Sequence, residues 1–210
     1  MPGRRELAPR AGVSLFSPPM SAKGESCFAA WDGAFSTEEL DRIVALGDGL
    51  ALRKADLFGA EDKTGTAEAA AIRVTRTAWI NPGPDTAWIF DRMQKVVVAL
   101  NGANWQFDLH GFSEAFQYTV YHGSEGGHYH WHVDQGTVPP RKLSLSLQLS
   151  EADAYEGCDL EFLPGHAAET APRGRGAIIA FPSYLLHRVT PITSGTRKSL
   201  VVWVTGPKLR

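Results

Sequence analysis

The sequence predicts a mainly β protein, built as a sandwich or as a barrel closed from two sheets, with helices covering one outer face. Three features of the 210-residue chain lead to this prediction. Short segments rich in strand-forming residues follow one another from about residue 115, separated by turns rich in glycine and proline. Helix signals dominate before about residue 110. The segment LSLSLQL (143–149) alternates strictly, which indicates a strand with one face on a core and the other on a wetter surface.

Six segments in the second half of the chain are predicted to be strands, because they combine β-branched and aromatic residues with flanking turn residues. They are AFQYTVYH (115–122), HYHWHV (128–133), KLSLSLQLS (142–150), CDLEFL (158–163), GAIIAFP (176–182) and RKSLVVWV (197–204). The earlier segment RVTRTAWI (73–80) alternates in the same way and is also predicted to be a strand. Many short strands in so short a length are typical of a sandwich or a closed barrel.

Two helices are predicted before the strands. The first begins at Ser36, whose side chain is suited to cap it, and Glu39 completes a capping box three residues later. We expect this helix to end at Gly47. The second helix is predicted to begin near Asp85 and to end at Gly102. These helices would form the outer cover of the barrel.

Composition excludes several classes of function. The net charge is −2, and no long run of Lys or Arg occurs, which argues against nucleic acid or an anionic membrane as the partner. No apolar stretch approaches the roughly 20 residues that span a bilayer. Cys27 and Cys158 lack the spacing of a zinc site or a disulfide framework, so we expect free thiols and a cytoplasmic location. A monomer or a homodimer is expected.

The chain divides into an arm and one domain. Residues 1–25 contain basic residues but no continuous apolar segment, and they are predicted to be a loose N-terminal arm. Residues 26–210 are predicted to be a single domain, with helical support over 26–113 and the barrel core over 114–206.

The pair His132 and Asp134 is the first indication of a metal site. In an extended strand the two side chains point the same way, with Val133 opposite. His187 follows an apolar run further along the chain and is a candidate third ligand. Two histidines and one carboxylate on one side of a metal form the facial triad of non-haem Fe(II) oxygenases. His130 shares the same alternation, so a zinc site built from His130 and His132 is an open alternative.

Arg197 is the second indication. It lies ten residues after His187, on the next predicted strand, across a predicted turn that contains Gly195. A dicarboxylate that chelates a metal at one end needs a cation for its far carboxylate, and the planar guanidinium suits that role. Strand parity places Arg197, Ser199, Val201 and Trp203 on one face, and Lys198 on the other. Taken alone, Arg197 would be interpreted as a solvated charge at the end of a strand.

Three segments together resemble a known family: HWHVD (130–134), YEGCDLEFLPG (155–165) and GAIIAFPSYLLHRVTPITSGTRKSLVVWVTGP (176–207). They resemble the Fe(II)- and 2-oxoglutarate-dependent dioxygenases, and the nearest branch is the prolyl 4-hydroxylase-like group that includes bacterial PKHD-type hydroxylases. The resemblance covers about residues 114–206. It implies a double-stranded β-helix, a cupin-like jelly-roll core with the metal at its open end.

The resemblance also implies roles for individual residues. His132, Asp134 and His187 would be the catalytic iron ligands, and Arg197 would bind 2-oxoglutarate. Tyr121 resembles the tyrosine that helps to bind the same carboxylate, with Tyr118 as the alternative. Cys158 departs from the pattern, because relatives commonly have a second glycine there.

The implied reaction is hydroxylation of an unactivated C–H bond. It uses Fe(II), 2-oxoglutarate and O2, releases succinate and CO2, and can be assisted by ascorbate in related enzymes. The branch acts on peptidyl residues such as proline, on free amino acids and on other small molecules. A nucleic-acid substrate is not expected, because dealkylases of the superfamily carry a second Arg where this chain has Trp203.

Candidate substrate contacts are Gln135, Arg73, Arg76 and Trp203. The simpler interpretation of the two arginines is exposure on an edge strand. His128 and His130 would lie just outside the metal shell or on the surface.

Two other classes of function compete with the dioxygenase. One is a non-catalytic, cupin-like module that binds or senses a metal. The other is a zinc-dependent hydrolase that uses His130, His132 and His187, in which Arg197 has no obvious role.

Overall fold

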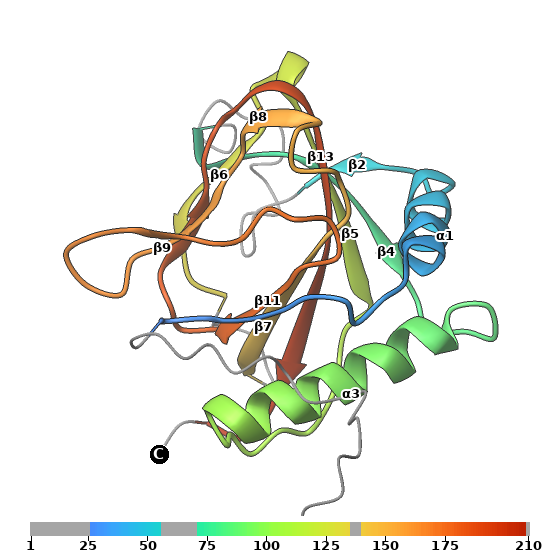
Figure 1. Cartoon of the computed structure of the whole chain (residues 1–210), viewed down its shortest axis with the longest axis vertical. Helices are drawn as coiled ribbons and strands as arrows, with labels where there is room; N and C mark the ends of the chain where they lie inside the picture. The colour runs from blue at the N-terminus through green and yellow to red at the C-terminus, as the bar shows by residue number, and fades with distance from the viewer. Residues whose placement is uncertain (1–25, 56–70, 135–139, 209–210) are drawn as a thin grey trace, which may run out of the picture.

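The computed structural model describes residues 26–55, 71–134 and 140–208, and the predicted N-terminal arm lies outside these residues. Two antiparallel sheets face each other, and the helices pack against the outer side of the larger sheet (Figure 1). This arrangement is a jelly roll, so the predicted fold class and the predicted position of the helices are confirmed. Neither of the described helices is long and apolar enough to cross a membrane.

Among the described residues the larger sheet has eight strands in the order β1-β11-β7-β13-β5-β4-β2, with β8 paired to β13. Their bounds are β1 Ala29–Trp31, β2 Arg53–Lys54, β4 Arg76–Ile80, β5 Phe116–His122, β7 Arg141–Gln148, β8 Tyr155–Gly157, β11 Ile178–Pro182 and β13 Ile192–Thr205. The long strand β13 pairs with β5 on one side and β7 on the other. Side chains from these three strands therefore share one inner surface.

The smaller sheet has the order β10-β9-β12-β6-β3 in the described part of the chain. Its strands are β3 Arg73–Val74, β6 His128–His132, β9 Leu160–Phe162, β10 Glu169–Thr170 and β12 His187–Val189. A short 3-10 helix, η1 Gly123–Glu125, connects β5 to β6. The strand predicted over 73–80 is divided at Thr75, so that its first part joins the smaller sheet and its second part the larger one.

Strand alternation on the larger sheet separates an apolar outer face from a more polar inner face. On β7, Leu143, Leu145 and Leu147 belong to the core beneath the helices. The residues between them, Ser144 and Ser146, point the other way, toward the space between the sheets. The wetter face predicted from LSLSLQL is therefore the inner wall of the barrel.

Helix α1 (Thr37–Asp48) begins as predicted. The Ser36 hydroxyl accepts a hydrogen bond from the Glu39 backbone at 3.2 Å, and the Glu39 carboxylate accepts one from the Ser36 backbone at 2.8 Å. The predicted end at Gly47 is wrong, because the helix continues to Asp48 and is capped by Gly49. Gly47 is instead a packing residue, since a Cβ there would lie 2.5 Å from the ring of Tyr118.

Helix α3 (Ala87–Asn104) also runs past its predicted end, Gly102. Gly102 is exposed, and a Cβ there would meet nothing within 4 Å. Neither Gly47 nor Gly102 has a positive φ, so neither adopts the left-handed conformation in which glycine commonly ends a helix.

The turn predicted around Gly195 is also wrong. Gly195 lies inside β13, where it pairs with Tyr155 of β8. Its φ is +74°, and a Cβ there would lie 2.1 Å from the Ala154 carbonyl oxygen. Glycine is therefore required here by a close approach of two strands.

We predict opposite effects for alanine at the two helical glycines. Gly47→Ala should lower the free energy of unfolding by about 1–3 kcal/mol, because the added methyl group meets the Tyr118 ring. Gly102→Ala should raise it by about 0.5–1 kcal/mol, because alanine favours the helix and has open space. Denaturant unfolding followed by circular dichroism measures both. A Gly47→Ala protein as stable as the Gly102→Ala protein would contradict the packing role.

Candidate metal centre and cosubstrate pocket

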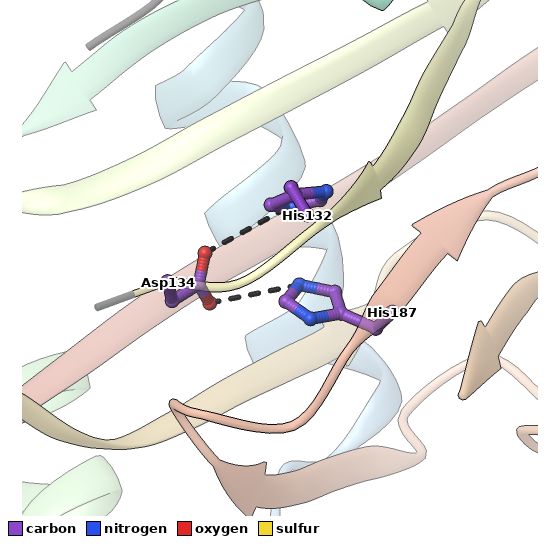
Figure 2. A group of neighbouring side chains, drawn as sticks. All are labelled: His132, Asp134 and His187. Carbon is purple, nitrogen blue, oxygen red and sulfur yellow. Dashed lines mark ion pairs between the residues drawn. The ribbon is translucent and has the colours of Figure 1, made fainter. Parts of the chain in front are cut away.

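The three predicted metal ligands meet in the space between the two sheets (Figure 2). His132 is the last residue of β6, and His187 is the first residue of β12, directly opposite in the antiparallel register. Asp134 follows β6 by two residues. Ligand atoms of the three side chains all lie within 4.8 Å of one another. Nε2 of His132 and Nε2 of His187 are each 3.7 Å from a different oxygen of Asp134.

Backbone carbonyls orient both imidazoles. Nδ1 of His132 lies 2.8 Å from the carbonyl oxygen of His130, and Nδ1 of His187 lies 2.9 Å from that of Leu185. A carbonyl oxygen only accepts hydrogen bonds, so Nδ1 carries the hydrogen in each ring. Each Nε2 therefore presents its lone pair to the centre of the group, which is the arrangement usual for a histidine that binds a metal.

The carboxylate of Asp134 is held by a pair of serines. Ser144 donates a hydrogen bond of 2.7 Å to Oδ2 of Asp134, and the Ser144 hydroxyl lies 2.9 Å from that of Ser183. The backbone N–H of Asp134 donates to the Ser183 carbonyl at 2.9 Å. The side chain and backbone of Asp134 are thus both fixed by the larger sheet, although the residue follows a strand of the smaller one.

The charges of this group favour metal binding at neutral pH. Burial and the neighbouring His187 lower the pKa of His132 to about 4, so its imidazole is neutral. Burial alone would raise the pKa of Asp134, but His187, His132 and the Ser144 hydrogen bond together hold that pKa below its usual value. A neutral imidazole at His132 and an ionised carboxylate at Asp134 are the protonation states that binding of a divalent cation requires of these two side chains.

A β-bulge in β6 explains why His130 is not part of the group. His187 pairs with His132 and Val189 pairs with Tyr129, so two residues of β6 oppose one residue of β12. Tyr129 and His132 both line the space between the sheets as a result, and His130 is exposed. Among the described residues, the potential metal-binding group is His132, Asp134 and His187, without His130.

His128 is held at the start of β6 by the backbone. Its ring nitrogens lie 2.9 Å from the Gly126 carbonyl oxygen and 3.4 Å from that of Ala71. It is therefore a side chain of the sheet edge, outside the described metal-binding group.

A cavity of about 320 Å³ opens from the three ligands. Its walls come from both sheets, and its polar lining includes Arg73, Glu114, Gln117, Tyr129, Arg141 and Trp203. Arg197, Ser199, Val201 and Trp203 all line it, as the parity of β13 predicted. Lys198 points the other way and donates to Asp48 of α1 at 2.6 Å.

Arg197 is buried in the wall of this cavity with 2% of its surface exposed. Nε and Nη2 donate to the side-chain oxygen of Gln148 at 3.1 and 2.9 Å, and no carboxylate pairs with the guanidinium in the described part of the chain. The ring of Tyr121 lies 5.6 Å from the guanidinium carbon. A buried cation without an anionic partner is costly, so an anion bound at this wall would be stabilising.

The structure separates the two candidate tyrosines. Tyr121 lines the cavity, and burial raises the pKa of its hydroxyl to about 12, so it is a neutral hydrogen-bond donor. Tyr118 faces the opposite side of β5, where its hydroxyl donates to Asp48 at 2.7 Å. Tyr121 is therefore the tyrosine that lies beside Arg197.

Cys158, the departure from the family pattern, has a φ of +56°. This left-handed backbone favours glycine, so a glycine in relatives and a cysteine here occupy a position with the same backbone demand. The thiol is fully buried beside Arg197, and burial raises its pKa, so it stays protonated next to the guanidinium.

The predicted substrate contacts fall in different places. Arg73 and Trp203 line the cavity. Arg76 does not line it and pairs with Glu125 at the exposed end of the sheet. Gln135 lies outside the described residues.

Several residues of this site did not stand out in the sequence. Ser144 and Gln148 were signalled only by the alternation of β7, which placed them on the inner face without assigning a role. Tyr129 was hidden by the bulge, because strict alternation from His132 would turn it away. Arg141 packs over the Trp203 ring at 3.8 Å and pairs with Glu114 at 2.5 Å, a contact between distant segments that no local pattern indicates.

Comparisons with known proteins agree with this geometry. The model of the 2OG-Fe(II) oxygenase superfamily matches residues 116–205. A PKHD-type hydroxylase of Teredinibacter turnerae is 38% identical over 86 residues, which are 38% of this chain and 38% of that protein. A PKHD-type hydroxylase of Acidovorax ebreus is 27% identical over 179 residues, covering 79% of this chain and 76% of that one. This chain thus spans 38% of the length of the Teredinibacter relative and most of the Acidovorax one.

Solved structures show the same fold. A Pseudomonas putida prolyl-4-hydroxylase has a TM-score of 0.67 at 20% identity, covering 87% of this chain and 94% of that one. A Trichoplax adhaerens prolyl hydroxylase, solved with a peptide fragment of a hypoxia inducible factor, has a TM-score of 0.68 at 17% identity, covering 86% and 84% of the two chains.

The jelly roll, the two-histidine and one-carboxylate group and the matched segment make this chain similar to the 2OG-Fe(II) oxygenase superfamily. The sequence relatives named above are PKHD-type hydroxylases, in agreement with the resemblance found in the sequence.

We predict that Ser144 tunes metal affinity through Asp134. Ser144→Ala removes the 2.7 Å hydrogen bond to the carboxylate and should weaken Mn(II) binding about tenfold or more. Ser146→Ala is the matched control, because Ser146 lies on the same face of β7 and makes no described contact with Asp134. Equilibrium titration of Mn(II) by electron paramagnetic resonance measures both variants. Equal affinities would show that Ser144 does not support the ligand.

Proposed function

We propose that this protein is an Fe(II)- and 2-oxoglutarate-dependent dioxygenase that hydroxylates an unactivated C–H bond. Bound iron and 2-oxoglutarate would supply the oxidising chemistry, with O2 consumed and succinate and CO2 released. His132, Asp134 and His187 would hold the iron, and Arg197 and Tyr121 would bind the far carboxylate of 2-oxoglutarate. Ascorbate would assist, as it does in related enzymes.

The observation that carries this proposal is the burial of Arg197 in the cavity that the three metal ligands share. Gln148 accepts hydrogen bonds from Nε and Nη2 of the guanidinium and the Cys158 thiol lies beside it, but no carboxylate of the described residues neutralises its charge. A zinc hydrolase or a simple metal sensor has no use for such a group. A dicarboxylate that is anchored at the metal and at Arg197 uses both parts of the site.

The chain's own residues would perform three tasks. The carbonyl-bonded histidines and the serine-bonded Asp134 keep the ligands on one side of the metal, so other coordination positions stay open. Arg197 orients the cosubstrate by a charge-assisted pair of hydrogen bonds. The apolar side chains around the cavity, such as Leu160 and Phe181, exclude water, which strengthens that pair.

The substrate would be a peptidyl residue such as proline, an amino acid or another small molecule, bound in the cavity that Trp203 lines. Both cysteines are free, which agrees with an enzyme of the reducing cytoplasm.

The first test is turnover of the cosubstrate. Protein reconstituted with Fe(II) under anaerobic conditions and then exposed to O2 should convert 2-oxoglutarate to succinate. His132→Ala, Asp134→Ala and His187→Ala should each abolish this conversion and leave the circular dichroism spectrum unchanged, because each removes a ligand and no part of the helical core. Normal succinate formation by any one variant would remove that residue from the ligand set. A metal that binds without any turnover in the unaltered protein would favour the sensing module.

A second test separates the two neighbouring cations of β13. Arg197→Ala removes one partner of a buried charge pair, a loss of about 2–5 kcal/mol, so the apparent 2-oxoglutarate requirement should rise about thirtyfold or more. Lys198→Ala is the control, because Lys198 contacts Asp48 on the opposite face of the same strand. The measurement is the rate of succinate formation against 2-oxoglutarate concentration. An unchanged requirement in Arg197→Ala would assign the anchor to another cation.

A further inference from the structure

We propose that the primary substrate of this site carries a carboxylate and that Arg73 binds it. The inference rests on the proposed function, because it concerns the substrate that would share the cavity with iron and 2-oxoglutarate. It narrows the substrate class to carboxylic acids, including free or N-substituted amino acids and chain-terminal residues. A residue inside a peptide chain, which has an amide in place of the carboxylate, falls outside this class.

Arg73 reaches the cavity close to the metal ligands. It is the first residue of β3, which pairs with β6, so it lies opposite Tyr129 in the register. Its guanidinium carbon is 4.6 Å from the centre of the Tyr129 ring, and that ring stacks on the imidazole of His132 with centroids 3.5 Å apart. The cation is therefore separated from a metal ligand by a single aromatic ring.

The guanidinium of Arg73 is only partly satisfied. Nη2 donates to the side-chain oxygen of Gln117 at 3.0 Å, whereas Nε is buried without a hydrogen-bond partner. No carboxylate pairs with Arg73 among the residues that the structure describes. Two neighbouring arginines differ from Arg73 in having a carboxylate partner, since Arg76 pairs with Glu125 and Arg141 pairs with Glu114.

Charge balance in the loaded cavity leads to the same conclusion. Fe(II) and Arg197 would together carry three positive charges, and Asp134 and the 2-oxoglutarate dianion would carry three negative ones. Arg141 and Glu114 neutralise each other. Arg73 would then be the remaining unneutralised charge among the described lining residues, and a substrate with one carboxylate would neutralise it.

A second unsatisfied donor lies in the same cavity. Trp203 is more than nine-tenths buried, and its indole N–H has no partner of good hydrogen-bond geometry among the described residues, although it lies near enough to Asp134 to help lower the pKa of that carboxylate. Buried N–H groups are almost always hydrogen-bonded in folded proteins. Two such donors, Nε of Arg73 and Nε1 of Trp203, in the wall of one cavity indicate a ligand that presents oxygen acceptors.

The test compares ligands that differ only in this charge. The protein is loaded anaerobically with Mn(II) and 2-oxoglutarate, and its tryptophan fluorescence is titrated with N-acetyl-L-amino acids and with the corresponding N-acetyl-L-amino amides. We expect at least one acid to bind about tenfold or more tightly than its amide. Arg73→Gln should weaken binding of that acid about thirtyfold and bring acid and amide within about twofold of each other.

Arg76→Gln is the matched control, because it removes the same charge three residues away, outside the cavity. It should keep the acid preference, and both variants should bind 2-oxoglutarate as the unaltered protein does. Amides that bind as well as acids, or an acid preference that survives Arg73→Gln, would overturn the proposal. Weaker 2-oxoglutarate binding by Arg73→Gln with an unchanged acid preference would overturn it as well, since Arg73 would then serve the cosubstrate.

The proposed function is judged separately by succinate formation. A protein that forms no succinate yet binds acids through Arg73 would refute the dioxygenase and retain the carboxylate site. A protein that forms succinate but shows no preference for acids would refute the carboxylate site and retain the dioxygenase.

Discussion

The antiparallel pairing of β6 with β12 is the constraint on which the site depends. It places His132 directly opposite His187, although the two residues are far apart in the sequence. A β-bulge lies between this residue pair and the next pair, Val189 and Tyr129. It turns the Tyr129 ring inward, where the ring stacks on His132. One strand pair thus supplies two of the three predicted metal ligands and the aromatic ring against which Arg73 packs. Asp134 is then placed by its bonds to the opposite sheet, so the site also holds the two sheets together at this end.

The two faces of the larger sheet have different roles, and this difference allows the cavity between the sheets to be lined by polar side chains. Successive side chains of its central strands point alternately to the apolar core beneath the helices and to the cavity. The apolar side chains stabilise the fold, and the polar ones line the candidate site. The cations on the cavity side are individually unfavourable to bury. Gln148 and Gln117 offset part of that cost by accepting hydrogen bonds from Arg197 and Arg73. The stability of the protein without ligands is therefore lower than an apolar cavity would allow, and anionic ligands should stabilise it.

Strand alternation and the family resemblance together predicted the fold and the convergence of His132, Asp134 and His187. Strand alternation assigned the faces of β7 and β13, and the capping box located the start of α1. Prediction failed where a contact between distant segments decided the outcome. Gly47 was expected to end a helix, but the ring of Tyr118 requires it within the helix. Gly195 was expected in a turn, but the approach of β8 requires it within β13. The inward position of Tyr129 depends on a register shift that only the partner strand reveals.

Lys198 and Arg197 are consecutive residues on opposite faces of β13. Lys198 is tied to Asp48 at the end of α1, and the same carboxylate accepts a hydrogen bond from Tyr118. A displacement of α1 across the sheet would therefore pull on the peptide unit next to Arg197. Consecutive residues of β13 therefore attach one strand to the outer helix through Lys198 and Asp48 and to the cavity wall through Arg197 and Gln148.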